Sequence, residues 1–205
     1  MRGRRVLLLD VMGTLVRDPF YDAVPRFFGT TLQALIADKH PTAWAEFEHG
    51  RIDEDELGRR FFVDGRAVDL VGLKRAMQDA YAWLPGIESL LGDLQAAGVE
   101  MHTLSNYPAW YRLIEDRLAL SRFVRWTLVS CITGLRKPDA SAFRHAVAAL
   151  GVDPSQVLFV DDRADNCAGA RACGIASIRF ENADSLRRDL LSHDLLSHNV
   201  GRGRL

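Results

Sequence analysis

The chain has 205 residues, 48% of them hydrophobic, so it can bury a full core as one domain or as a domain with an insertion. Its 26 basic and 27 acidic residues leave a formal net charge of -1, which disfavours binding to nucleic acid or to an anionic membrane. The first apolar run, Val6–Leu9, is far shorter than the ~20 residues of a membrane span or a typical secretory signal. These features predict a cytoplasmic protein whose partner is a small molecule, and they leave its oligomeric state open.

Short apolar runs alternate with helical patterns along most of the chain, and glycine follows several of these helices. Such alternation predicts an α/β fold with a Rossmann-like parallel sheet covered by helices. The expected strands are Val6–Leu9, Val99–Leu104, Trp126–Val129, Val157–Val160 and Ala176–Phe180. The expected helices between the later strands are Gly86–Ala97, Ala140–Leu150 and Asn166–Cys173.

One long interval between the first strand and the helix at Gly86 contains helical patterns but no convincing strand. Its candidate helices are Thr42–His49, Asp53–Phe62 and Asp69–Trp83, with Asp53 as an N-cap. We therefore expect a small inserted α-helical cap at 17–84, and an α/β core made of 1–16 and 85–205.

Polar residues follow the predicted strands at the points where those strands end. In an open parallel sheet, ligands bind outside the carboxyl ends of the strands, so these residues are expected to meet at one edge. They are Asp10 to Thr14 after the first strand, Ser105 and Asn106 after the second, Lys137 to Asp139 beyond the third, and Asp161 and Asp162 after the fourth.

Asp10 is the expected nucleophile of this edge. A carboxylate followed by a tight turn through Gly13 and Thr14 can attack an electrophilic phosphorus or carbon while turn amides hold the substrate oxygens. Ser105 would donate a hydrogen bond to a phosphoryl oxygen, and Asn106 would help to orient the substrate.

Attack by a carboxylate on a phosphate requires charge neutralisation. Mg²⁺ bound to Asp10, to the turn carbonyl of Met12, and to Asp161 or Asp162 would provide it, with Lys137 as a fixed cation. Each residue alone has an ordinary structural explanation as a cap, a turn or a solvated loop. Their joint occurrence at successive strand ends favours a catalytic site.

Four segments resemble the four motifs of the haloacid dehalogenase superfamily of hydrolases: Asp10–Val16, Leu104–Asn106, Lys137–Asp139 and Phe159–Asp162. The resemblance implies a covalent intermediate on the first aspartate and binding of the transferring group by Ser105 and Lys137. It also implies Mg²⁺ at the late acidic residues, and a helical cap that closes over the substrate.

Met12 departs from the usual pattern of phosphatases in that superfamily, which carry a general acid and base two residues after the nucleophile. A thioether cannot transfer a proton, and general acid–base catalysis contributes ~10²–10⁴-fold. The dehalogenases of the superfamily also lack this acid, because a halide leaves without a proton. The Asp161–Asp162 pair nevertheless favours Mg²⁺, because uncompensated carboxylates beside Asp10 would raise its pKa.

Further segments are similar to the plant chloroplast flavin mononucleotide hydrolases and their bacterial relatives, a group within the superfamily that also has Met at this position. They include Val16–Tyr21, Lys39–Pro41 and Asn106–Pro108. The resemblance implies a flavin substrate. Aromatic residues that could stack on a flat ring, or pack in the core, are Phe20, Tyr21, Trp44, Tyr107 and Trp110. Arg17 is a candidate for a substrate anion or for a surface ion pair.

The leading hypothesis is a Mg²⁺-dependent phosphatase that acts on a small phosphomonoester, flavin mononucleotide among the candidates, through an aspartyl-phosphate on Asp10. Two alternatives stay open. One is a 2-haloacid dehalogenase-type hydrolase that forms an ester on Asp10. The other is a non-catalytic scaffold that binds a phosphorylated ligand.

Overall fold

A five-stranded parallel sheet forms the centre of the computed structural model, which describes residues 5–196. The strand order is β3-β2-β1-β4-β5, with β1 in the middle. Each strand agrees within one residue at either end with its expected range, so the predicted Rossmann-like sheet is confirmed. The strands are β1 (Val6–Leu9), β2 (Glu100–Ser105), β3 (Arg125–Val129), β4 (Val157–Asp161) and β5 (Ala176–Arg179).

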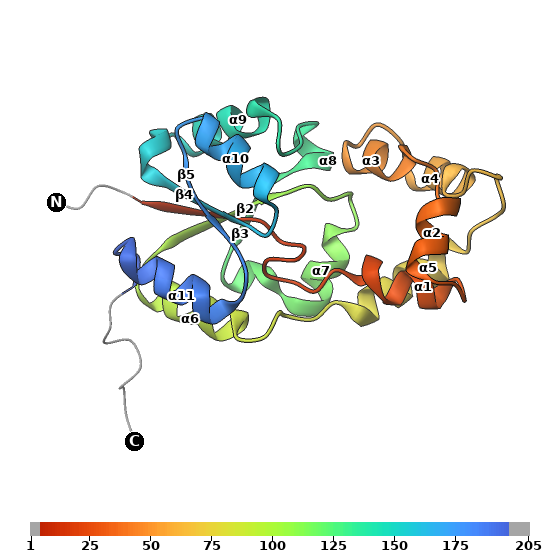
Figure 1. Cartoon of the computed structure of the whole chain (residues 1–205), viewed down its shortest axis with the longest axis horizontal. Helices are drawn as coiled ribbons and strands as arrows, with labels where there is room; N and C mark the ends of the chain where they lie inside the picture. Colours follow the sequence, from red (N-terminus) through yellow and green to blue (C-terminus); the bar gives the residue numbers. More distant parts are fainter. Residues whose placement is uncertain (1–4, 197–205) are drawn as a thin grey trace, which may run out of the picture.

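Helices cover both faces of the sheet (Figure 1). On one face lie α9 (Ala140–Leu150) and α10 (Ala164–Ala172), and on the other lie α6 (Ile87–Ala96), α7 (Tyr111–Leu118) and α11 (Ala183–Ser192). Successive residues of β1 alternate between two hydrophobic clusters, with Val6 and Leu8 in one and Leu7 and Leu9 in the other. This strand is therefore buried on both sides, as its unbroken apolar sequence requires.

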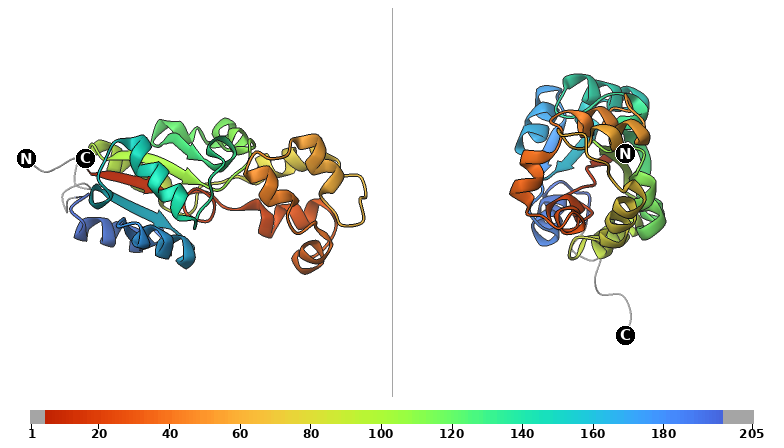
Figure 2. Two further views of the ribbon diagram at one scale, coloured as in Figure 1. Left: turned by 90° about the horizontal axis from the view of Figure 1, so that it is seen from above. Right: turned by 90° about the vertical axis from the view of Figure 1, so that its right-hand side faces the viewer.

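The residues between β1 and α6 form a separate helical lobe at one end of the molecule (Figures 1 and 2). We call residues 19–80 the helical lobe. It contains η1 (Pro19–Tyr21), α1 (Ala23–Phe27), α2 (Leu32–Asp38), α3 (Ala43–Glu48), α4 (Glu54–Arg60) and α5 (Leu70–Ala80). The helices expected near Thr42–His49, Asp53–Phe62 and Asp69–Trp83 correspond to α3, α4 and α5. Sequence periodicity missed α1 and α2, since both are short and α1 contains Pro25.

Two chain segments run side by side between the sheet and the helical lobe. Val16 forms an antiparallel bridge with Trp83, and the Arg17 amide donates to the Ala82 carbonyl at 2.9 Å. The junction therefore lies close to the predicted linkers. The division into a core of 1–16 with 85–205 and a cap of 17–84 is kept as a proposal.

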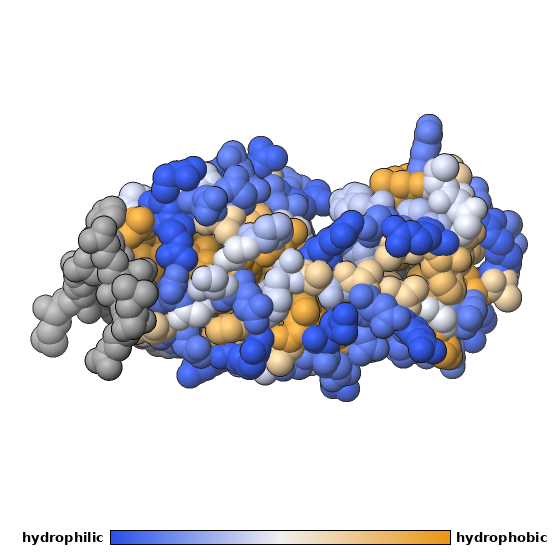
Figure 3. Space-filling view, turned by 90° about the horizontal axis from the view of Figure 1, so that it is seen from below, coloured by the Kyte–Doolittle hydropathy of each residue, from blue (hydrophilic) through white to orange (hydrophobic). Residues whose placement is uncertain are grey.

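Apolar side chains reach the surface on both parts of the molecule, including the helical lobe at the right of Figure 3. Tyr21, Ile36, Val63 and Val71 are large exposed hydrophobic residues there. Within residues 5–196, no helix has the length and apolar character needed to cross a membrane.

Candidate active site

The candidate site lies where the strand order reverses. The chain passes from β1 outward to β2 and β3 and then returns to place β4 on the other side of β1. The carboxyl ends of β1 and β4 therefore border the crevice in which α/β proteins bind ligands. Asp10 directly follows β1 and Asp161 ends β4, so the sheet itself brings these two carboxylates together.

Lys137 joins the two carboxylates. Its Nζ lies 2.6 Å from Asp10 Oδ1 and 2.7 Å from Asp161 Oδ2, and all three side chains are buried. Burial acts to lower the pKa of Lys137, but the two carboxylates outweigh it, so that pKa is raised and the ammonium form is favoured. Burial, opposed by Lys137 and assisted by Asp161 and Asp162, raises the pKa of Asp10 from 3.8 to about 7.

A tight turn after Asp10 links the ends of the two strands. Thr14 Oγ1 donates to Asp10 Oδ2 at 3.1 Å and accepts from the Asp162 amide at 3.1 Å. Gly13 adopts a φ of +78°, and a Cβ at this position would lie 2.8 Å from Asp162 Oδ2. Gly13 is therefore required for the backbone conformation of the turn. Thr14 is required for the hydroxyl that holds the Asp10 carboxylate in one orientation.

The acidic residues fit a divalent cation. Asp10, Asp161 and Asp162 each present a carboxylate oxygen, and these oxygens lie within 4.8 Å of one another. Burial and the neighbouring Asp161 raise the pKa of Asp162 as well. Three converging carboxylates share only Lys137 as a buried counter-charge among the described residues, so a bound cation would relieve their repulsion.

Asp161 and Asp162 differ in how many protein donors they already have. Asp161 accepts hydrogen bonds from the Arg163 amide at 2.9 Å and from Asn166 Nδ2 at 3.0 Å, in addition to Lys137. No side-chain donor contacts the Asp162 carboxylate within residues 5–196, and hydrogen bonds in the turn leave the Met12 carbonyl unused. The oxygens best able to accept a cation are therefore those of Asp10, Asp162 and the Met12 carbonyl.

Asn106 and Ser105 occupy the end of β2 in different ways. Asn106 lines the cavity, and its side chain accepts from the Lys137 amide at 2.9 Å and donates to the Lys137 carbonyl at 2.8 Å. It thereby fixes the loop that carries the lysine. Ser105 is buried at the strand end and is not among the residues that line the cavity. Direct contact of either side chain with a substrate stays a prediction.

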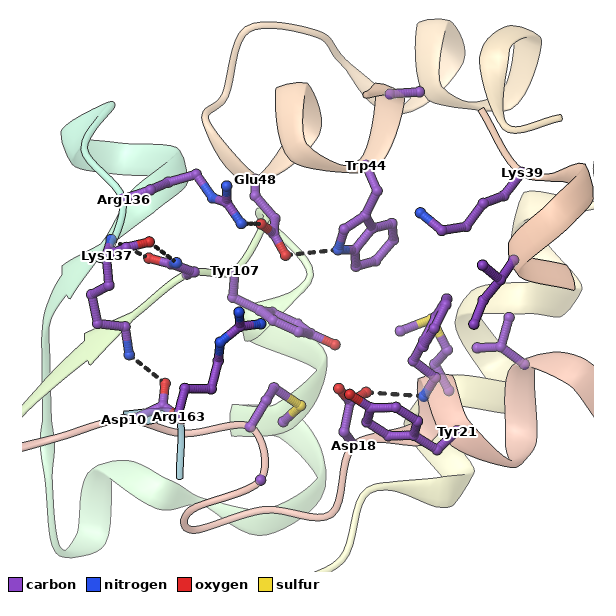
Figure 4. A pocket seen from close by; sticks show the side chains of 18 of the residues that line it. Asp10, Asp18, Tyr21, Lys39, Trp44, Glu48, Tyr107, Arg136, Lys137 and Arg163 are labelled. Carbon is purple, nitrogen blue, oxygen red and sulfur yellow. Dashed lines mark hydrogen bonds and ion pairs between the residues drawn. The ribbon is translucent and has the colours of Figure 1, made fainter. Parts of the chain in front are cut away.

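A cavity of about 540 Å³ extends from this cluster into the helical lobe. Figure 4 shows Asp10 and Lys137 at one side, Trp44 and Lys39 at the other, and Asp18 and the Tyr107 hydroxyl between them. Four of the five aromatic candidates line it, Phe20, Tyr21, Trp44 and Tyr107. Trp110 does not, because it is buried against Trp44 and Phe47 and donates to Glu54.

The cavity also contains polar residues to which the sequence analysis assigned no role, namely Asp18, Lys39, His40, Glu48, Arg136 and Arg163. They come from loops and helix ends of two lobes, and no spacing rule links them. The Asp18-Pro19 pair was a detectable signal, because an aspartate before proline is typical of a helix N-cap.

Arg17, a candidate for binding an anionic group of the substrate, pairs with Asp22 and is not among the residues that line the cavity. Its substrate-binding role stays a prediction.

Comparison with known proteins shows which family the chain resembles. A family model described as haloacid dehalogenase-like hydrolase matches residues 5–174. The chain is 51% identical over 185 residues to flavin mononucleotide hydrolase 1 of Arabidopsis thaliana, named as chloroplastic, covering 90% of this chain and 76% of that one. It is 35% identical over 193 residues to a phosphoglycolate phosphatase of Pseudomonas syringae, covering 85% and 68% of the two chains.

Solved structures share the fold. A haloacid dehalogenase family enzyme of Bacteroides thetaiotaomicron, crystallised with magnesium and inorganic phosphate, superposes with a TM-score of 0.72 at 21% identity over 90% of this chain and 99% of that chain. The L-2-haloacid dehalogenase of Xanthobacter autotrophicus gives a TM-score of 0.63 at 20% identity over 95% and 85%.

The chain belongs to the haloacid dehalogenase-like hydrolases.

Proposed function

We propose that this hydrolase is a Mg²⁺-dependent phosphatase that converts flavin mononucleotide to riboflavin through an aspartyl-phosphate on Asp10. The observation that carries the proposal is the cavity that joins a buried nucleophile to aromatic walls, in a chain 51% identical to a flavin mononucleotide hydrolase. A volume of about 540 Å³ suits a ligand of drug-like size.

The residues at the sheet end of the cavity support phosphoryl transfer. Asp10 attacks phosphorus with the carboxylate that Thr14 and Lys137 hold in place. Lys137 neutralises charge on the phosphoryl oxygens, and the Gly13-Thr14 turn offers amides to them. Because Asn106 fixes both backbone groups of Lys137, the ammonium has little freedom to leave the site.

Mg²⁺ would be held by Asp10, the Met12 carbonyl and Asp162, with Asp161 as a further carboxylate of the same cluster. When bound, it supplies positive charge that neutralises both the carboxylates and the phosphoryl oxygens. It would also lower the pKa of Asp10 and so keep the nucleophile ionised at neutral pH.

We further propose that the helical lobe acts as the selective cap. Its cavity wall is mostly apolar and aromatic, and besides Glu48 it carries two polar residues placed next to each other, Lys39 and His40. Lys39 has no carboxylate partner among the described residues. His40 Nδ1 accepts from the amides of Thr42 and Ala43, so its hydrogen is on Nε2. A planar ring system whose edge carries carbonyl oxygens, such as isoalloxazine, matches this arrangement.

The mechanism is tested by assaying flavin mononucleotide, phosphoglycolate and p-nitrophenyl phosphate with Mg²⁺ and with EDTA. We expect flavin mononucleotide to have the highest kcat/KM, EDTA to abolish turnover, and Asp10→Asn to lower kcat by at least ~10³-fold. Retention of activity in Asp10→Asn or in EDTA contradicts this mechanism. Metal-independent halide release from 2-chloropropionate would instead establish the dehalogenase alternative.

The role of the lobe is tested separately with Lys39→Met. Loss of one charged hydrogen bond should raise KM for flavin mononucleotide by about tenfold and leave p-nitrophenyl phosphate hydrolysis unchanged. Arg59→Met on α4 removes an exposed cation outside the cavity and serves as the control. An equal effect of Lys39→Met on both substrates argues against ring recognition by the lobe.

That the chain acts on a small phosphorylated substrate is part of this proposal. Cytoplasmic location also stays a prediction, since the Arabidopsis relative is named as chloroplastic.

A further inference from the structure

Met12 leaves the proposed reaction without a proton donor two residues after the nucleophile. Riboflavin leaves as an alcohol, and its departing oxygen needs a proton at the moment the P–O bond breaks. Four acidic side chains line the cavity, Asp10, Asp18, Glu48 and Asp162. Asp10 is the nucleophile and Asp162 belongs to the metal cluster, so Asp18 and Glu48 remain as candidates.

Glu48 is held by other groups. The Arg136 guanidinium lies 2.6 Å from its Oε2, and Trp44 Nε1 donates to its Oε1 at 2.7 Å. Burial raises the pKa of Glu48, while Arg136 and Trp44 oppose that rise, so both of its oxygens are engaged by neighbouring side chains. Glu48 is therefore better suited to holding α3 against the sheet domain than to donating a proton.

Asp18 is free of such pairing. Its Oδ1 accepts one hydrogen bond, from the Phe20 amide at 2.9 Å, and no cation pairs with it among the described residues. Its second oxygen has no protein donor within that same part of the chain. In Figure 4 the carboxylate projects into the cavity below the Tyr107 hydroxyl, between the Asp10–Lys137 pair and Lys39.

The surroundings of Asp18 favour its protonated form. Burial raises the pKa of Asp18, the Phe20 amide opposes the rise, and Asp162 and Asp22 add to it. The other titratable groups near it are the Glu48 carboxyl and the hydroxyls of Tyr81 and Tyr107, which bond to each other at 2.7 Å and carry no charge at neutral pH.

The position of Asp18 matches the place of the leaving oxygen. In the proposed reaction phosphorus lies next to Asp10, and the cavity that continues from there into the helical lobe offers room for the rest of the substrate. The ester oxygen joins these two parts. Asp18 lies at the junction, two residues beyond the bridge between Val16 and Trp83.

We propose that Asp18 is the general acid and base of the reaction, replacing the acid absent at position 12. In the first step, an Asp10 oxygen bonds to phosphorus, the P–O ester bond breaks, and the Asp18 proton moves to the departing oxygen. In the second step, a water molecule gives a proton to Asp18 and the water oxygen bonds to phosphorus. The bond between phosphorus and the Asp10 oxygen then breaks, which releases phosphate and restores the Asp10 carboxylate.

This inference rests on the proposed phosphatase function, and a leaving-group comparison tests it. Asp18→Asn keeps an oxygen that accepts from the Phe20 amide, so η1 is preserved. In single-turnover experiments with Mg²⁺, release of riboflavin from flavin mononucleotide should fall about 100-fold. Release of p-nitrophenol from p-nitrophenyl phosphate should change less than about threefold, since nitrophenolate leaves without a proton.

Two further variants make the outcome decisive. Asp18→Ser, which also keeps an N-cap acceptor, should show the same difference between substrates. Glu48→Gln should change the first-turnover rates of both substrates by the same factor. An equal first-turnover effect of Asp18→Asn on both substrates, or none, overturns the role of Asp18. A parent enzyme inactive toward every phosphate ester overturns the proposed function itself.

Discussion

The two ends of the cavity are built on different physical principles. At the sheet end, the buried Lys137 Nζ lies within 2.7 Å of a carboxylate oxygen of each of the buried residues Asp10 and Asp161. At the lobe end, apolar and aromatic side chains surround Lys39 and His40. The comparison suggests that reactivity is fixed by ionic hydrogen bonds at strand ends, whereas selectivity depends on how helices of the lobe pack.

The largest effect is expected from removing the cation at the sheet end. Lys137→Met leaves Asp10 and Asp161 buried without a counter-charge and should lower the free energy of unfolding by about 3–5 kcal/mol. Urea unfolding in the presence of EDTA measures this loss of unfolding free energy. Lys74→Met removes a partly exposed pair with Glu54 and should cost less than about 1 kcal/mol. Similar losses in the two variants would mean that the buried cluster is no more important than a surface pair.

The lobe end should respond to apolar volume instead of charge. Leu73 on α5 is fully buried in the hydrophobic cluster that joins the lobe to one face of the sheet. Leu73→Ala should cost about 3 kcal/mol, measured by thermal or urea unfolding. Val71→Ala, at an 81% exposed position of the same helix, should stay within about 0.5 kcal/mol. A small loss for Leu73→Ala would show that the lobe packs loosely.

A smaller effect is expected at the start of α4, where the lobe depends on local hydrogen bonding. Asp53 Oδ1 accepts from the Glu56 amide at 2.8 Å, as the sequence predicted for an N-cap. Asp53→Ala should lower the free energy of unfolding by about 1 kcal/mol. Asp55→Ala, in the first turn but without a capping bond, should cost only a few tenths of a kcal/mol. Equal losses would attribute the effect to charge near the helix end.

The smallest effect concerns the junction between the two ends and depends on pH. Because burial raises the pKa of Asp18, its ionised form disfavours the folded state. Its contribution to stability is full below the unfolded pKa and is lost as pH rises through the folded pKa. Asp18→Asn should therefore raise Tm relative to the parent by an amount that grows as pH rises above about 4. A Tm difference that does not change with pH would mean that Asp18 titrates normally.

The sheet end was largely predictable from sequence. Its residues directly follow apolar runs, and a parallel sheet must bring strand ends to one edge. The bonds of Thr14 to Asp10 and Asp162 explain why a Gly-Thr turn follows the nucleophile. Sequence patterns did not distinguish Asp161 from Asp162, since only the fold reveals that Lys137, Arg163 and Asn166 already donate to one of them.

The lobe end was much less predictable. Its aromatic residues were recognisable as types, but Trp44 and Trp110 carry the same side chain and only one of them faces the cavity. Helix α2, which precedes Lys39 and His40, was not expected. Short helices depend on tertiary contacts for their stability, so local pattern does not reveal them.

The amino-acid sequence by itself determined the α/β class, the helices between the first two strands, and the candidate nucleophile with its acidic and basic neighbours, because these follow from local periodicity and from residues adjacent to strands. The tertiary structure alone decided the environment of those groups. The pKa of Asp10 is raised to about 7 by burial and by carboxylates more than a hundred residues away. The placement of Asp18 between two lobes depends on the same long-range packing, which no short segment encodes.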